Sequence, residues 1–208
     1  KADAIAAAGK PFRHTRSPFA PLDPLTAEQL EQIDDASLRI IEETGIDFLD
    51  DEALRLWAAA GARVDFTHQH VWADRSLVRE LIASVPHQFT LRARNPERSL
   101  TIGGNHINFA TVGGAPFYSD LETGRRPGTL DDFRTMTRLA NQCGPIHIAE
   151  GLLLEPQDVP VPVRHLEKAL AQFTLTDKAL TAAAHGRNVA GDYMAMAATV
   201  YGSPEAAP

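Results

Sequence analysis

The chain has 208 residues, of which 44% are hydrophobic and 23% are charged. This apolar content is typical of a folded protein with a sizeable core and excludes an intrinsically disordered chain. The formal net charge of −7 at pH 7 argues against nucleic acid and anionic membranes as partners, because both require a basic surface. Small ligands and other proteins remain as candidate partners.

The single cysteine, Cys143, cannot form an internal disulfide, so we expect a protein of a reducing compartment, the cytoplasm. No run of about eighteen apolar residues occurs, and we therefore expect no membrane span. The chain begins with Lys1 instead of Met, and its last letters, GSPEAAP, follow a helical stretch without a clear stop. We expect a processed or truncated chain.

The chain up to residue 86 is predicted to be mainly helical after an extended, Pro-rich arm over residues 1–25. Thr26 and Gln29 form a capping-box pair that begins the first helix, and Gly45 ends it. Further elements before Pro86 are a helix over 51–60, a short hairpin or extended connector over 63–72, and a helix over 75–85 with Asp74 as its N-cap.

After Pro86 the hydrophobic pattern alternates between apolar and polar residues. Phe89 and Leu91 begin this pattern, and Leu100 and Ile102 resume it after the turn at Asn95-Pro96. Alternation around a turn is typical of an antiparallel ribbon. We therefore predict a second region, 26–105, that combines the helices with this ribbon.

From His106 onward, three apolar runs each end on glycine: INFATVGG, PIHIAEG and KALTAAAHG. If the runs end at Val112, Glu150 and His185, they are 38 and 35 residues apart. A (β/α)₈ barrel uses roughly 31 residues per repeat. Residues 106–208 are therefore predicted to be the first three βα repeats of a partial TIM barrel, within an α/β fold whose sheet either closes or stays open. Three strands would leave bare sheet edges, so we expect either a longer chain or a homo-oligomer.

The carboxyl ends of parallel strands meet at one edge of a sheet, where ligands bind. Glu150 and His185 each precede the terminal glycine of such a run, and Asn108 and Thr111 come from the first run. A carboxylate beside an imidazole can hold a cationic substrate or move protons near neutral pH. The alternative is that Glu150 caps a loop amide and that His185 hydrogen-bonds within the strand end.

The stretch SDLETGRRPGTLDDF, residues 119–133, concentrates charges around a glycine. Thr129 and Asp132 form a second capping box. Asp120, Arg125 and Arg126 flank a tight turn that would let a carboxylate pair with a guanidinium. One interpretation is a loop held rigid by ion pairs, and the other is that the arginines face an acidic partner or a phosphate-bearing cofactor.

Other motifs give weaker signals. His68 and His70 have the spacing of two metal ligands on a strand, but no third ligand stands at a recognisable distance, so we expect no metal. The common nucleotide-binding and serine-hydrolase motifs do not occur in the sequence.

The run GGAPFYSDLETGRRPGTLDDF, together with EETGIDF before it and TLTDKAL after it, resembles the amino-terminal half of the trimethylamine methyltransferase family. The resemblance implies a TIM barrel that transfers a methyl group from a tertiary or quaternary amine to the cobalt of a corrinoid. A separate protein would carry this corrinoid (cobalamin), and the segment itself would bind no cofactor. A betaine-type amine is as compatible with the resemblance as trimethylamine.

A quaternary ammonium is held by aromatic faces and carboxylates, and Phe109, Phe117, Tyr118 and Glu150 are the local candidates. We assign no catalytic residue, and we expect the isolated 208-residue chain to be inactive because family members extend beyond it. The alternatives are a non-catalytic binding or assembly module, and an enzyme of the same fold with another substrate.

Overall fold

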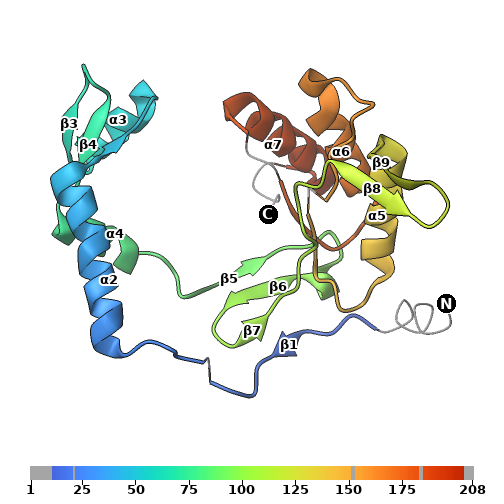
Figure 1. Cartoon of the computed structure of the whole chain (residues 1–208), viewed down its shortest axis with the longest axis horizontal. Helices are drawn as coiled ribbons and strands as arrows, with labels where there is room; N and C mark the ends of the chain where they lie inside the picture. The colour runs from blue at the N-terminus through green and yellow to red at the C-terminus, as the bar shows by residue number, and fades with distance from the viewer. Residues whose placement is uncertain (1–10, 21, 151–152, 183–184, 204–208) are drawn as a thin grey trace. The chain divides into compact units, whose positions relative to one another are not determined.

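A computed structural model of the chain describes residues 11–20, 22–150, 153–182 and 185–203; the side chain of Glu150 is outside this description (Figure 1). The chain divides into two compact units. Phe19–His87 forms the helical unit, and Lys1–Pro18 together with Gln88–Pro208 forms the strand–helix unit. Of the predicted arm, residues 1–10 and 21 lie outside the described residues.

The helical unit follows the sequence prediction closely. Its helices are α2 (Ala27–Arg39), a π-helical turn (Ile40–Thr44), α3 (Asp51–Ala59) and α4 (Arg75–Ala83). A small antiparallel sheet has the order β2 (Ile46–Asp47), β4 (His70–Trp72), β3 (Arg63–Asp65). The capping box of Thr26 and Gln29 and the N-cap Asp74 are confirmed, because Thr26 and Asp74 each accept a backbone N–H of the first turn and Gln29 accepts that of Thr26.

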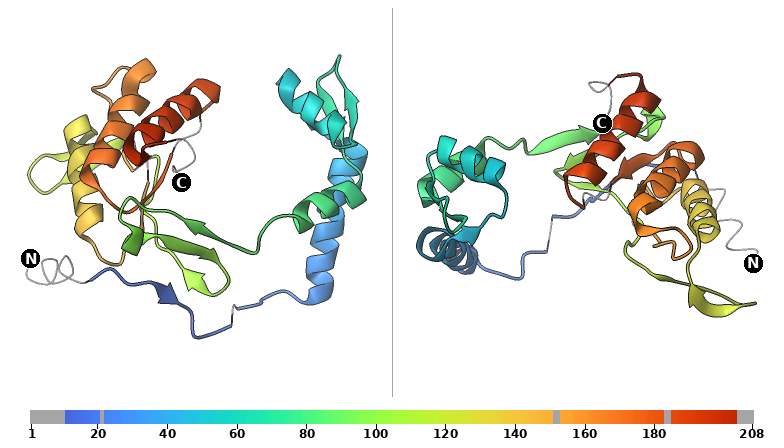
Figure 2. Two further views of the ribbon diagram at one scale, coloured as in Figure 1. Left: turned by 180° about the vertical axis from the view of Figure 1, so that it is seen from behind. Right: turned by 90° about the horizontal axis from the view of Figure 1, so that it is seen from above.

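The strand–helix unit contains several short sheets and a row of helices (Figures 1 and 2). The antiparallel pairs are β1 (Thr15–Arg16) with β7 (His106–Ile107), β5 (Gln88–Leu91) with β6 (Leu100–Gly103), and β8 (Phe117–Asp120) with β9 (Gly124–Pro127). A 3₁₀ turn (Pro96–Arg98) links β5 to β6, which confirms the predicted ribbon. The parallel pair is β10 (Ile148–Glu150) with β11 (Ala179–Thr181), and the helices are α5 (Leu130–Gln142), α6 (Val161–Leu175) and α7 (Arg187–Tyr201).

Phe12 and Arg13 of the predicted arm are tied to this unit by the buried imidazole of His147. Its Nε2 donates to the carbonyl of Arg13 at 2.8 Å, and its Nδ1 accepts the backbone N–H of Phe109 at 2.9 Å. Phe12 packs edge-on against the same ring, with ring centroids 5.3 Å apart. Because Nδ1 accepts and Nε2 donates, the hydrogen bonds assign the ring hydrogen to Nε2.

The core of the strand–helix unit consists of two clusters of buried apolar side chains. One joins the ribbon to the parallel strands (Ala93, Leu100, Ile148 and Ala179), and the other joins α5 and α6 to the segment after β10 (Phe133, Leu153, Leu154 and Ala171). Both clusters lie around β10 and its neighbours, so the core supports the parallel strands.

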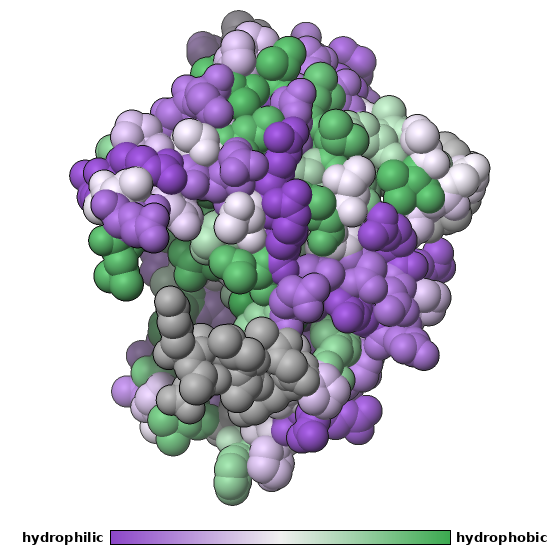
Figure 3. Space-filling model, turned by 90° about the vertical axis from the view of Figure 1, so that its right-hand side faces the viewer, coloured by the Kyte–Doolittle hydropathy of each residue, from purple (hydrophilic) through white to green (hydrophobic). Residues whose placement is uncertain are grey.

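Helix α6 buries a different face from the one that its apolar pattern predicts. The helical spacing of Leu166 and Leu170 predicts that both are buried, but they are 36% and 49% exposed. The buried residues of α6 are Lys168, Ala169, Ala171 and Gln172. Small alanines allow the helix to lie close to the core, and the two polar side chains form hydrogen bonds. The face of the molecule drawn in Figure 3 shows apolar areas separated by hydrophilic side chains.

The expected mixture of helices and strands is confirmed, whereas the partial TIM barrel is not. Within the described residues the sheets have two or three strands and none closes into a barrel. The ribbon β5–β6 belongs to the same unit as residues 106–208. The predicted boundaries after residues 25 and 105 remain predictions. No described helix has both the length and the apolar character needed to cross a bilayer.

Candidate functional site

Parallel chain segments define one edge of the strand–helix unit. Ala110 forms a parallel bridge with Ile148, and β10 pairs in parallel with β11 so that Glu150 lies opposite Thr181. Segments from all three predicted repeats therefore run in the same direction. Their following loops leave from the same edge, as expected for a ligand site of an α/β protein.

The loops that follow the first two segments also contact each other. The backbone N–H of Glu155 donates to the carbonyl of Ala115 at 2.8 Å, and that of Gln157 donates to Gly128 at 2.7 Å. A Cβ at Gly128 would lie 2.8 Å from the side chain of Leu154. This close approach explains the glycine, because any larger residue would push the two loops apart.

The predicted residues of the parallel strands are placed as follows. The backbone of Glu150 ends β10, opposite Thr181. The third run ends its ladder at Thr181, before His185, so the predicted strand end lies too far along the chain. His185 is exposed in the segment that follows, and residues 183–184 between them are outside the described residues. Asn108 is half-buried, and its Nδ2 donates to the carbonyl of Thr101 at 2.8 Å.

The β8–β9 hairpin brings Tyr118, Asp120 and Arg126 together on one face, because residues opposite each other in an antiparallel pair share a face. Tyr118 packs against the buried cluster around Phe133, and the Arg126 guanidinium lies 4.9 Å from its ring centroid. Arg125 is on the other face, 3.6 Å from the centroid of the exposed Phe117 ring. The two neighbouring arginines therefore have different environments.

The bidentate ion pair expected in this loop forms with the helix instead. Arg126 donates to both carboxylate oxygens of Asp132, at 2.6 and 2.8 Å, while Asp120 is 4.0 Å from Arg126. Asp132 also completes the capping box with Thr129, which is confirmed. Hydrogen bonds from Arg126 hold the pKa of Asp132 well below its usual range.

Asp120 shapes the turn of the hairpin. Its carboxylate accepts the backbone N–H groups of Glu122 and Thr123 and the hydroxyl of Thr123. These hydrogen bonds, those from Thr123 first, lower the pKa of the Asp120 carboxyl. Gly124 follows with a φ of +66°, which favours glycine. The described contacts of Asp120 are thus those of a turn.

A charged cluster that the sequence analysis missed joins the loop after β10 to helix α6. Lys168 is 3% exposed, and its Nζ donates to the carboxylate of Glu155. Arg164 lies 3.9 Å from the same carboxylate and donates to the carbonyl of Val159. The one available signal was a lysine between the apolar residues of HLEKALAQF.

His68 and His70 each contact an aspartate. His68 lies 2.7 Å from Asp65, and His70 lies 2.5 Å from Asp47. Among the described side chains, no group of three or more His, Cys, Asp or Glu residues could hold a metal ion. We therefore build no metal site from these histidines.

Comparison with known proteins identifies the family. The family model described as "Trimethylamine methyltransferase (MTTB)" matches residues 1–208. The chain is 35% identical over 181 residues to a glycine betaine methyltransferase of Desulfitobacterium hafniense strain Y51. The aligned region covers 87% of this chain and 37% of that protein. It is 29% identical over 181 residues to the trimethylamine methyltransferase MttB of Desulfitobacterium hafniense strain DSM 10664 / DCB-2, covering 86% of this chain and 36% of that protein. The chain thus spans little more than a third of the length of these curated relatives, and it belongs to the trimethylamine methyltransferase family.

Proposed function

We propose that this chain forms the amino-terminal part of a methyltransferase that removes a methyl group from a tertiary or quaternary amine of the trimethylamine or betaine type. The acceptor is the cobalt of a corrinoid carried by a separate protein. The proposal is supported by the family match and by the names of the two relatives, one a glycine betaine and the other a trimethylamine methyltransferase.

The parallel alignment of Ala110, β10 and β11 is the structural observation that carries the proposal. It gives Glu150 a position at the edge from which all three following loops depart. We propose that the hydrogen-bonded loops after the first two segments form one wall of the site. In α/β proteins, such an edge is where ligands bind.

Each proposed binding residue has a chemical role. The carboxylate of Glu150 attracts the positive charge of the amine, and Tyr118, whose ring already lies 4.9 Å from the Arg126 guanidinium, is proposed as an aromatic residue of the same site. His185 is proposed to supply an imidazole to this edge, whereas Asn108 precedes Ala110, the parallel partner of Ile148, and so lies toward the amino ends of the segments.

The β8–β9 hairpin is proposed to face the partner protein. Arg126 and Asp120 give the hairpin its shape through their contacts with Asp132 and Thr123. Arg125 is exposed and stacked on Phe117, so it presents a positive charge beside an apolar ring. We propose Arg125 as the partner-facing cation of this loop.

The corrinoid, when bound to its own protein, supplies the nucleophile that accepts the methyl group. The described residues offer no group of three or more metal-ligating side chains. We assign no residue of this chain to holding the corrinoid. What these residues contribute is binding and orientation of the amine.

The test uses the complete protein and isothermal titration calorimetry with glycine betaine and trimethylamine. Glu150→Gln keeps the side-chain shape and removes the charge, and His185→Ala removes the imidazole. We expect Glu150→Gln to weaken binding of the preferred amine at least tenfold, and the exposed Glu97→Gln on the 3₁₀ turn to leave it unchanged. Unchanged affinity in both site variants would remove Glu150 and His185 from the site.

Transfer itself is measured by mixing the complete protein, the amine and a reduced corrinoid protein and following the corrinoid absorption spectrum. The expected result is amine-dependent methylation of the corrinoid. If binding occurs without any transfer, the protein is an amine-binding module and not this enzyme.

A further inference from the structure

We infer that Gln172 is a positioning residue whose side-chain amide joins the carboxyl ends of β10 and β11 and thereby sets the position of Glu150. The inference rests on the proposed function, because Glu150 is the binding residue proposed there. Gln172 lies on α6, is 1% exposed and was not singled out by the sequence.

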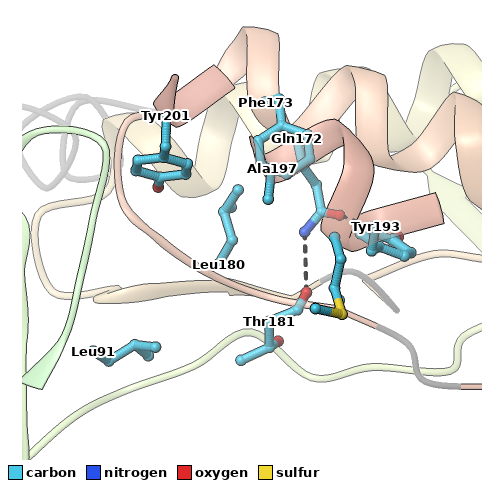
Figure 4. Close-up of a pocket in the computed structure, with 10 residues that line it drawn as sticks. Leu91, Gln172, Phe173, Leu180, Thr181, Tyr193, Ala197 and Tyr201 are labelled. Atoms are coloured by element: carbon cyan, nitrogen blue, oxygen red, sulfur yellow. Dashed lines mark hydrogen bonds between the residues drawn. The ribbon is translucent and has the colours of Figure 1, made fainter. Parts of the chain in front are cut away.

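The amide nitrogen of Gln172 donates to one carbonyl on each strand. Nε2 lies 3.2 Å from the oxygen of Ala149 and 3.4 Å from the oxygen of Thr181 (Figure 4). An amide NH₂ has two hydrogens to donate, so one serves each strand. The carbonyl of Ala149 belongs to the peptide group that leads into Glu150. The carbonyl of Thr181 belongs to the peptide group that leads out of β11.

The oxygen of the same amide is held from the other side. Oε1 accepts the hydroxyl of Tyr193, a residue of α7 that is 6% exposed, at 3.4 Å. Burial, aided by the carboxylate of Glu155, raises the pKa of Tyr193 to about 12, so its O–H stays available as a donor. This contact fixes which way the amide points: oxygen toward Tyr193 and nitrogen toward the strands.

The amide lies beside an apolar pocket of about 270 Å³, lined among others by Leu91, Phe173, Leu180 and Tyr201 (Figure 4). An apolar lining offers the strand carbonyls few other donors. Without Gln172, the ends of β10 and β11 would therefore lose a polar link that the pocket lining does not replace.

A second buried polar side chain links the same strands at their opposite ends. Lys178 immediately precedes β11, and its Nζ donates to the carbonyl of Ile146, just before β10, at 2.6 Å. Lys178 is 1% exposed, like Gln172. It provides a matched control, since its loss weakens the same strand pair away from the proposed site.

The experiment compares Gln172→Met and Lys178→Met in the complete protein, because methionine keeps roughly the length of both side chains. The affinity for glycine betaine and trimethylamine is measured by calorimetry. We expect Gln172→Met to weaken binding of the preferred amine about tenfold, since small displacements of a binding group are costly. Lys178→Met should change the affinity less than twofold, although it lowers stability. Equal weakening in both variants, or none in Gln172→Met, would overturn the inference.

Amide hydrogen exchange provides a readout that does not depend on the proposed function. Gln172→Met should speed exchange at Glu150 and at the residues after Thr181, whereas Lys178→Met should act at the amino ends of β10 and β11. Unaltered exchange at the carboxyl ends in Gln172→Met would refute the positioning role even if no amine binds. Failure of wild-type protein to bind either amine, with the exchange pattern as expected, would reject the proposed substrate alone.

Discussion

Replacing Lys178 by methionine should destabilise the strand–helix unit strongly. The ammonium of Lys178 donates to the carbonyls of Ala140 and Cys143 at 2.7 Å each, and to that of Ile146 at 2.6 Å. Ala140 and Cys143 end α5, so the positive charge also meets the negative end of the helix dipole. One side chain thus closes the turn between α5 and β10.

The magnitude follows from these three hydrogen bonds. Bonds from a charged donor contribute roughly 1.5–3 kcal/mol each, which would give a loss of about 5–9 kcal/mol. Removing the buried charge recovers several kcal/mol of desolvation cost. Burial lowers the pKa of Lys178 to about 8, while the three carbonyls favour the ammonium, so the charged form is present at pH 7. We expect a net loss of about 3 kcal/mol in the free energy of unfolding at pH 7.

Amide hydrogen exchange along α5, β10 and β11 measures this loss locally. Both tryptophans of the chain, Trp57 and Trp72, lie in the helical unit, so the urea transition of their fluorescence is an internal control that should not move. Arg138→Met, an exposed cation on α5, should change stability by no more than about 0.5 kcal/mol. A loss below about 1 kcal/mol for Lys178→Met would refute the reasoning, because the three carbonyls would then have other partners.

Further predictions concern pH and backbone strain. Hydrogen bonding to Asp47 raises the pKa of His70. The stability that this contact contributes should therefore be complete below about pH 6.5 and be lost as the pH rises through the folded-state pKa. Asp47→Asn should flatten this pH dependence in thermal melting followed by tryptophan fluorescence. The lowered pKa of Asp132 predicts stability that is present above about pH 4 and lost on acidification, and Asp132→Asn should show a smaller loss between pH 5 and pH 2 in circular dichroism. Gly45→Ala should cost about 1–3 kcal/mol, because φ is +81° and the new Cβ would overlap His70 Nε2 and lie 2.6 Å from the carbonyl oxygen of Val71. Gly61→Ala should lower the free energy of unfolding less, because φ is +98° but no atom lies within 4 Å of the new Cβ. Urea titration followed by tryptophan fluorescence measures both losses.

Helix starts and ends were predictable because they depend on neighbours within one turn. The capping box of Thr129 and Asp132, like that of Thr26 and Gln29, joins residues three positions apart, and both formed as expected. The antiparallel ribbon was equally predictable, since its two strands follow each other with a short turn between them.

The candidate site was predictable only in part. The carboxyl end of β10 at Glu150 followed from an apolar run that ends on a polar residue and glycine. The end of β11 could not be predicted in this way, because the alanines after Thr181 continue the apolar pattern beyond the hydrogen-bonded ladder. Composition cannot show where pairing stops, because that depends on the length of the neighbouring strand.

The sequence by itself determined the helices, their caps, the ribbon and the family, because local hydrogen bonds and a distinctive run of residues carry that information. Only the tertiary structure decided that α6 buries Lys168 and Gln172 instead of Leu166 and Leu170. It also decided that Arg126 pairs with Asp132 while Arg125 remains exposed. The physical reason is that burial and pairing depend on which distant segments approach a side chain, and helical periodicity does not encode that approach.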